Sequence, residues 1–225
     1  MTKGTKTFAP LAALTAILLA YAVWLIADAP YESSMLLIQK IFYFHVASWV
    51  AMYCGIGVCC VASIAALFKG SRAADRWGVS AAELVVLFGL NGLISGPLWA
   101  RKAWGFWWTW EPRLTISFLM WLIFVSYLLV RRFGGPGSEK LAAAVGIFGT
   151  AVSPFVYVSV DIWRTIHPKT SVVPDLVMNW NKGFGAPLLV SALSFVCLFV
   201  LLMMLRVGLA DRQAAVDELY LAHEE

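Results

Sequence analysis

The stretch that decides the fold is residues 184–205, FGAPLLVSALSFVCLFVLLMML, which contains no charged side chain. A helix needs about 20 apolar residues to cross the roughly 30 Å hydrocarbon core of a bilayer. Five further apolar runs of comparable length precede this one, at about 8–27, 42–67, 80–98, 114–130 and 141–160. The pattern predicts an all-α polytopic membrane protein with six transmembrane helices.

The composition of the whole chain agrees with a membrane protein. Of the 225 residues, 61% are apolar and only 13% are charged, and the mean hydropathy is +0.78. An ordinary soluble domain is roughly half apolar and about a quarter charged. Because no long polar stretch exists to build a soluble domain, we expect residues 1–225 to form a single membrane domain.

The loop charges favour one orientation of the six spans. With both termini inside, the inner segments carry 10 Lys and Arg residues and the outer segments carry 7, so the positive-inside rule favours cytoplasmic termini. The first run follows Lys3 and Lys6, and a cleaved signal peptide is the alternative interpretation. The run is longer than the usual h-region and Pro30 follows it directly, which favours a retained helix. The basic residues form no single face or stripe, so a nucleic-acid partner is not expected.

Tryptophan is concentrated in one outer segment. Residues 99–110, WARKAWGFWWTW, contain five of the eleven tryptophans of the chain. An interfacial aromatic belt accounts well for the isolated residues Trp24, Trp49 and Trp77. It does not account for a contiguous cluster, whereas a wide, flat, apolar ligand would, because indole rings offer large rigid faces for stacking. Gly105 allows close backbone approach, and Pro112 suits the first turn of the fourth helix.

Two of the three histidines are expected at the same face of the membrane as this cluster. His45 lies at the outer end of the second run and His167 follows the fifth, whereas His223 lies in an acidic tail and is expected to be solvated. Each histidine alone fits a surface or hydrogen-bonded residue. Together they can supply the two axial ligands of a haem iron, with the tryptophans covering the porphyrin. A zinc site is less favoured, because no further Cys or His lies on that side.

Basic side chains on the outer face can bind the two haem propionates. The candidates are Arg101, Lys102, Arg113, Arg164, Lys169 and Lys182. Covalent c-type attachment to this chain is excluded, because none of its four cysteines lies in a C-x-x-C-H motif. These cysteines are expected to be buried apolar residues.

The motif carries a resemblance to a known family. Residues 104–115, WGFWWTWEPRLT, resemble the tryptophan-rich "WWD" signature of haem-handling proteins. The whole chain is similar to the haem exporter protein C (CcmC) family of the cytochrome c maturation system in its length, its six spans, and the order His45, Trp motif, His167. One departure is Glu111, which stands where the family normally has Asp and whose carboxylate reaches one methylene further.

The resemblance implies a function and a set of site residues. It implies a multi-pass protein of the bacterial inner membrane, with the Trp-rich segment 99–115 in the periplasm. His45 and His167 would be the axial ligands of a b-type haem that is bound non-covalently and transiently. The other residues implied to contact the haem are Trp104, Trp107, Trp108, Trp110, Glu111, Arg113, Arg101 and Arg164.

The resemblance also implies partners. The chain would deliver haem to a periplasmic haem chaperone, the E protein, within a complex containing the A and B subunits of an ATP-binding cassette (ABC) transporter and the small D protein. The chain would be a haem-transfer subunit rather than an enzyme. It has no G-x-x-x-x-G-K-[ST] motif, so a partner would hydrolyse ATP.

Two other functions remain open from the residues themselves. A membrane b-type cytochrome would usually have histidines within helices at more than one depth. A non-haem permease subunit could use the Trp segment as a gate, with polar groups inside the membrane. Glu83 and Asn91 are the nearest candidates, although Glu83 is expected to snorkel and Asn91 to form an interhelical hydrogen bond. Met178 is a spare candidate iron ligand, although a loop-packing role is commoner.

Overall fold

The computed structural model describes residues 3–31, 36–167 and 183–224. The described elements are helices, with no β-strand among them, which confirms the all-α prediction. They are α1 (Lys3–Asp28), the short 3₁₀ helix η1 (Leu37–Lys40), α2 (Ile41–Lys69), α3 (Arg72–Ala103), α4 (Pro112–Phe133), α5 (Ser138–Ile162) and α7 (Gly185–Glu224).

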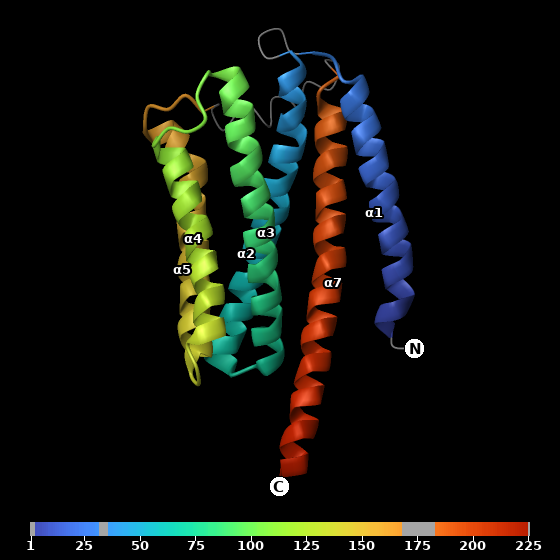
Figure 1. Cartoon of the computed structure of the whole chain (residues 1–225), viewed down its shortest axis with the longest axis vertical. Helices are drawn as coiled ribbons and strands as arrows, with labels where there is room; N and C mark the ends of the chain where they lie inside the picture. Colours follow the sequence, from blue (N-terminus) through green and yellow to red (C-terminus); the bar gives the residue numbers. More distant parts are fainter. Residues whose placement is uncertain (1–2, 32–35, 168–182, 225) are drawn as a thin grey trace.

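In the described part of the chain, six helices are long and apolar enough to cross a membrane, in agreement with the six predicted spans. Most extend beyond the apolar run at both ends, because polar residues continue a helix into the interface without disturbing its backbone hydrogen bonds. The last helix is the extreme case. It continues through the acidic tail, so that α7 projects past the other helices (Figure 1).

The helix α2 lies at the centre of the bundle. It packs against α3, α5 and α7, while α4 packs against α3 and α5, and α1 packs against α7. The beginning of α1 and the end of α7 lie at one end of the bundle, and the α3–α4 connection lies at the other (Figure 1). We call these the terminal end and the Trp end of the bundle.

The interface between α2 and α3 depends on small residues. A Cβ atom on Gly92 would lie 2.7 Å from Cε2 of Trp49, so only glycine leaves room for this indole. Nearby, Asn91 Nδ2 donates a hydrogen bond of 2.6 Å to Ser48 Oγ across the same interface, which confirms the interhelical hydrogen bond predicted for Asn91.

The middle of the Trp-rich segment, residues 104–111, is a loop between the ends of two helices. Helix α3 ends at Ala103, and the chain turns at Gly105, whose φ of 87° is a conformation that favours glycine. Helix α4 then begins at Pro112, as predicted, with Glu111 as its N-cap. The side chain of Glu111 makes no capping hydrogen bond and points elsewhere.

Glu83 has a charged partner on another helix. Its carboxylate accepts two hydrogen bonds from Arg206 of α7, of 2.5 and 2.6 Å. A bidentate pair of this kind satisfies both charges at once, so the acidic residue in α3 is a link between two helices.

A candidate haem site at the Trp end of the bundle

His45 lies in the second turn of α2 and is buried, with only 8% of its surface exposed. Its Nε2 accepts a hydrogen bond of 3.1 Å from the indole N–H of Trp49, one turn further along the helix. Its Nδ1 lies 3.0 Å from Ser95 Oγ on α3. The sequence placed His45 at the outer end of the second run, and contacts with Ser95 and Trp99 of α3 bury it there within the bundle.

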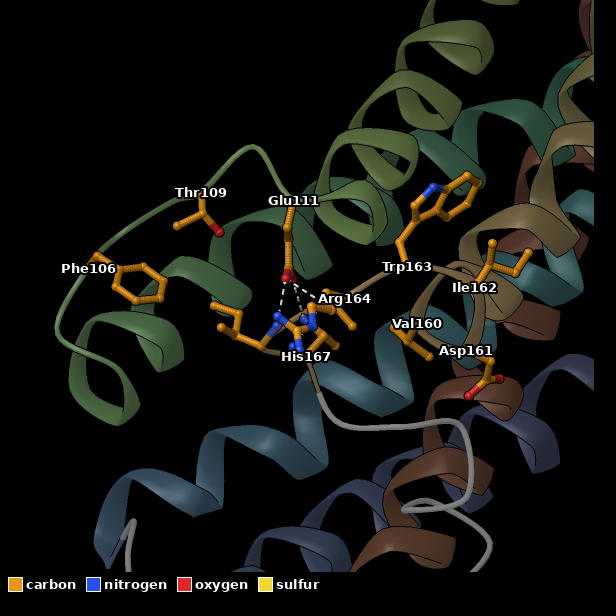
Figure 2. A pocket seen from close by; sticks show the side chains of 11 residues that line it. Phe106, Thr109, Glu111, Val160, Asp161, Ile162, Trp163, Arg164 and His167 are labelled. Carbon is orange, nitrogen blue, oxygen red and sulfur yellow. Dashed lines mark hydrogen bonds and ion pairs between the residues drawn. The ribbon is translucent and has the colours of Figure 1, made fainter.

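His167 is tied to the Trp segment through Glu111. Its Nδ1 lies 3.3 Å from Glu111 Oε1, close enough for an ion pair but not aligned for a hydrogen bond. The other carboxylate oxygen accepts hydrogen bonds from the Thr165 hydroxyl and, at 3.0 Å, from the backbone N–H of Ile166. Thr165 Oγ1 in turn accepts a 3.0 Å hydrogen bond from the His167 N–H. One carboxylate therefore holds the segment that carries His167 against the start of α4 (Figure 2).

The protonation of this pair follows from its surroundings. Burial alone would raise the pKa of Glu111, but His167, the Thr165 hydroxyl and the Ile166 amide outweigh it, and the net pKa lies below its ordinary value. Burial lowers the pKa of His167, and contact with Glu111 opposes this shift only in part. A carboxylate beside a neutral imidazole is the arrangement that orients a histidine for metal binding.

Two tryptophan rings connect the histidines. The ring of Trp99 lies with its centroid 6.4 Å from that of His45 and 5.2 Å from that of Trp104. Trp104 in turn makes an edge-to-face contact with His167, at 5.9 Å. His45, Trp99, Trp104 and His167 thus form a continuous series of rings, which we call the aromatic bridge.

The other tryptophans of the segment have different neighbours. Trp108 and Trp110 contact each other, with centroids 5.7 Å apart, and both pack edge-to-face on Phe118 of α4. Trp107 is 56% exposed and lies beneath the Arg101 guanidinium, 6.0 Å from it. The predicted Trp set therefore divides into Trp104 within the aromatic bridge, Trp107 beside Arg101, and Trp108 and Trp110 against Phe118 of α4.

An open cavity of about 1030 Å³ lies at the His167 end of the bridge, and His167 is the bridge residue that lines it. Figure 2 shows Phe106 and Thr109 along one side of it, Glu111 and His167 at its centre, and Trp163 and Ile162 on the other side. Asp161 and Arg164 also line it. The cavity combines aromatic and aliphatic surface with a few charged groups, which is typical of ligand sites.

The predicted propionate partners also differ in their positions and contacts. Arg164 is exposed and lines the cavity, and Lys102 is exposed at the end of α3. Arg101 donates to the Gly105 carbonyl and helps to hold the turn. Arg113 is partly buried and interacts electrostatically with Tyr53, Tyr157, Glu111 and Asp161. The predicted residues Lys169, Lys182 and Met178 lie outside the described residues.

Buried polar atoms without a hydrogen-bond partner gather at this end. Of nine such side-chain atoms in the described residues, six belong to the Trp segment, the start of α4 or His167. They are Trp99 Nε1, Trp108 Nε1, Thr109 Oγ1, Glu111 Oε1, Thr115 Oγ1 and His167 Nδ1. Glu111 Oε1 and His167 Nδ1 face each other at 3.3 Å. Buried polar groups are normally paired, so the other four atoms are ones that a bound molecule could complete. In the part of the chain that the structure describes, no group of three or more His, Cys, Asp and Glu side chains could hold a bare metal ion.

The predicted site residues did not include several of the residues that shape the site. Trp99 was in the quoted Trp segment but was not singled out, and Trp49 was interpreted as an interfacial residue. Trp49 instead donates to His45, and its spacing of four residues from His45 on one helix is the sequence feature that could have revealed this. The spacing between Thr165 and Glu111 gives no such indication, because 54 residues separate them.

The six apolar helices define the class of the protein, a multi-pass helical membrane protein, and a histidine pair joined by tryptophan rings distinguishes one end of it. The sequence model of the family "Heme exporter protein C" (CcmC) matches residues 1–219. The chain therefore belongs to the haem exporter protein C family, as the sequence resemblance had indicated.

Individual relatives agree with this assignment. Heme exporter protein C of Bradyrhizobium diazoefficiens is 35% identical over 195 residues, covering 85% of this chain and 74% of the relative. That of Haemophilus influenzae is 26% identical over 196 residues, covering 86% and 80%. A shorter match, 45% identical over 58 residues, covers 26% of this chain and 18% of the cytochrome c biogenesis protein CcsA of Phaseolus vulgaris.

Proposed function

We propose that this protein binds haem at the Trp end of the bundle, between His45 and His167, and delivers it to a haem chaperone during c-type cytochrome biogenesis. The observation that supports the proposal is the aromatic bridge, which connects histidines from two separate segments through the contacting rings of Trp99 and Trp104. The family assignment supports the coarser part of it, a haem-handling role in cytochrome c biogenesis.

The residues present fit a haem. Glu111 beside Nδ1 of His167 favours the tautomer with the proton on Nδ1, which leaves the Nε2 lone pair for iron. Phe106 and Trp163 line the cavity and could contact the porphyrin, and Arg164 at the cavity and the nearby Arg113 are the cations for propionates. The unpaired polar atoms of the Trp segment support a ligand at this end.

The chain's own part in transfer is to hold, orient and release its cargo. Histidine ligation would occupy both axial positions of the iron, while the open side of the cavity would leave a haem edge accessible to the chaperone. Trp107, Trp108 and Trp110 would lie close to that opening, since Phe106 and Thr109 of the same segment line the cavity. Release of the haem requires the loss of at least one axial ligand, so at least one histidine must be able to dissociate from the iron.

The assembly follows from the family. We propose that the protein works in the bacterial inner membrane with an ABC transporter, corresponding to the A and B subunits, and with the small D protein. The Trp end would face the periplasm and both termini the cytoplasm, with residues 1–225 acting as one membrane domain. ATP would be hydrolysed by a partner, and the bound haem would be b-type, non-covalent and transient.

The test is the absorption spectrum of the purified protein with added haem, for the unaltered chain and for His45→Ala and His167→Ala. We expect a six-coordinate, low-spin spectrum for the unaltered chain and a high-spin or haem-free spectrum for each variant. His223→Ala is the matched control, because His223 lies on the exposed part of α7 and should leave the spectrum unchanged. A spectrum that neither His45→Ala nor His167→Ala alters would overturn the proposal.

A further inference from the structure

The hydrogen bonds around His45 assign its proton. An indole N–H can only donate, so Nε2 of His45 must be the acceptor of the 3.1 Å hydrogen bond from Trp49. Ser95 donates its own hydroxyl hydrogen to the Asn91 carbonyl at 2.8 Å, so its oxygen accepts at 3.0 Å from His45. His45 is therefore neutral, with its proton on Nδ1, and both of its ring nitrogens are occupied.

The nitrogen that Trp49 occupies is the one that iron would need. With the proton on Nδ1, Nε2 holds the only lone pair suited to axial ligation. Iron and the Trp49 N–H therefore compete for the same lone pair. His167 differs, because its Nδ1 faces Glu111 and its Nε2 is the nitrogen left for the metal.

The position of Trp49 is built into the bundle. Its indole lies in a notch on α3 where a Cβ atom on Gly92 would be 2.7 to 2.9 Å from three of its ring atoms. Its spacing of one helical turn from His45 keeps donor and acceptor on the same face of α2. Trp49 is thus held where it meets Nε2 whenever His45 is not bound to iron.

We propose that Trp49 is a positioning residue that acts as an internal competitor for His45 and makes it the releasable axial ligand. This inference rests on the proposed function, since it takes His45 as an iron ligand. When haem binds, the Nε2 lone pair exchanges the indole hydrogen bond for a coordinate bond to iron, and no proton leaves either ring. When the coordinate bond breaks, Trp49 recaptures Nε2, which stabilises the five-coordinate state from which haem departs through His167 alone.

The test is the rate of haem transfer from the loaded, full-length protein to excess apomyoglobin, with the low-spin fraction recorded beforehand. Trp49→Phe keeps a ring in the Gly92 notch but removes the N–H. We expect haem release to slow about two- to tenfold, the range that one net hydrogen bond sets, and the low-spin fraction to rise. Trp24→Phe is the matched control, because Trp24 is 58% exposed on α1, and its release rate should be unchanged.

A second background separates competition from a general packing effect. In His45→Ala, Trp49 has no imidazole to capture, so adding Trp49→Phe should leave the release rate unchanged. If Trp49→Phe does not fold, Gly92→Ala displaces the indole instead, and Gly57→Ala is its control because no atom lies within 4 Å of an added Cβ there.

The outcomes distinguish this inference from the proposed function. Slower release in Trp49→Phe, abolished in the His45→Ala background, supports the competition. An unchanged release rate in Trp49→Phe, with faster release in His45→Ala, overturns the competition but keeps His45 as a ligand. An unchanged release rate in His45→Ala overturns both.

Discussion

The two ends of the bundle differ in how their polar side chains are satisfied. At the terminal end, Arg131 lies 2.7 Å from Asp75 and 3.5 Å from Glu139, and Arg76 lies 2.6 Å from Asp211. At the Trp end, six buried polar atoms of the Trp segment, the start of α4 and His167 have no hydrogen-bond partner. Among the terminal-end pairs named above, Arg131 Nε is the one such atom.

This difference indicates that the charged pairs of the terminal end are structural, whereas the unpaired polar atoms of the Trp end belong to a binding site. An unpaired buried polar group lowers the free energy of unfolding by about 1–3 kcal/mol. Several such groups together are therefore expected only where a bound molecule supplies their hydrogen-bond partners. The paired charges of the terminal end tie α3 to α4 and α7, and α4 to α5, and need no further partner. We therefore expect substitutions at the Trp end to change haem binding, and substitutions at the terminal end to change stability alone.

The largest effect is expected for Glu111→Ala. This change removes the acceptor of Thr165 and Ile166 and the neighbour of His167 Nδ1, so the segment that carries the ligand is released. Loss of a carboxylate that orients a metal-binding histidine typically costs about 10- to 100-fold in affinity. Titration with haem, followed by absorption, measures the change.

The control for Glu111 is Glu139→Ala, which removes a carboxylate at the terminal end and should leave haem affinity unchanged. Glu111→Asp sharpens the test, because the shorter side chain can reach only some of these partners and should give an intermediate affinity. Equal affinities for Glu111→Ala and Glu139→Ala would remove the distinction between the two ends.

A smaller effect is expected within the Trp segment itself. Trp104→Leu breaks the aromatic bridge between Trp99 and His167 and should weaken haem binding about three- to tenfold, the scale of one aromatic contact. Trp107→Leu alters a ring that is 56% exposed and should change affinity by less than about twofold. The same haem titration compares the two variants. A larger loss in Trp107→Leu would place the porphyrin on the outer side of the loop.

The fold was predictable from the sequence because lipid imposes a simple rule. Every backbone polar group inside a bilayer must be paired within the chain, so long apolar runs such as 184–205 become helices. The turn at Gly105 and the start of α4 at Pro112 depend on local sequence, since each follows from the backbone preference of one residue.

The site was predictable in its residue types but not in its contacts. The sequence indicated that His45 and His167 share one end of the bundle with the tryptophans, but not that Trp49 would occupy His45 Nε2. That contact depends on how α2 rotates against Gly92 of α3, which hydropathy does not encode. The pairing of Glu83 with Arg206 escaped prediction for a related reason, because 123 residues separate them.

The Glu83–Arg206 pair provides a prediction about stability. Glu83→Gln leaves Arg206 without its bidentate partner, and both side chains are partly exposed, so we expect a loss of about 1–2 kcal/mol in the free energy of unfolding. Denaturant unfolding in detergent micelles measures it, and the double variant Glu83→Gln/Arg206→Gln should recover part of the loss. The haem spectrum should be that of the unaltered protein. A changed spectrum would mean that this pair, which links α3 to α7, is coupled to the histidines.

The smallest effect is expected for Arg76→Ala. Its partner Asp211 is 52% exposed and Arg76 itself 30%, and ion pairs of this kind contribute about 0–1 kcal/mol. The unfolding midpoint should scarcely move, and added salt should reduce the difference further, because salt screens exposed charges. Arg131→Ala should lower the free energy of unfolding more than Arg76→Ala does, because both side chains of the Arg131–Asp75 pair are only about 20% exposed. If Arg76→Ala instead weakened haem binding as strongly as Glu111→Ala, the two ends would not be independent. The unpaired polar atoms at the Trp end would then not identify the haem site.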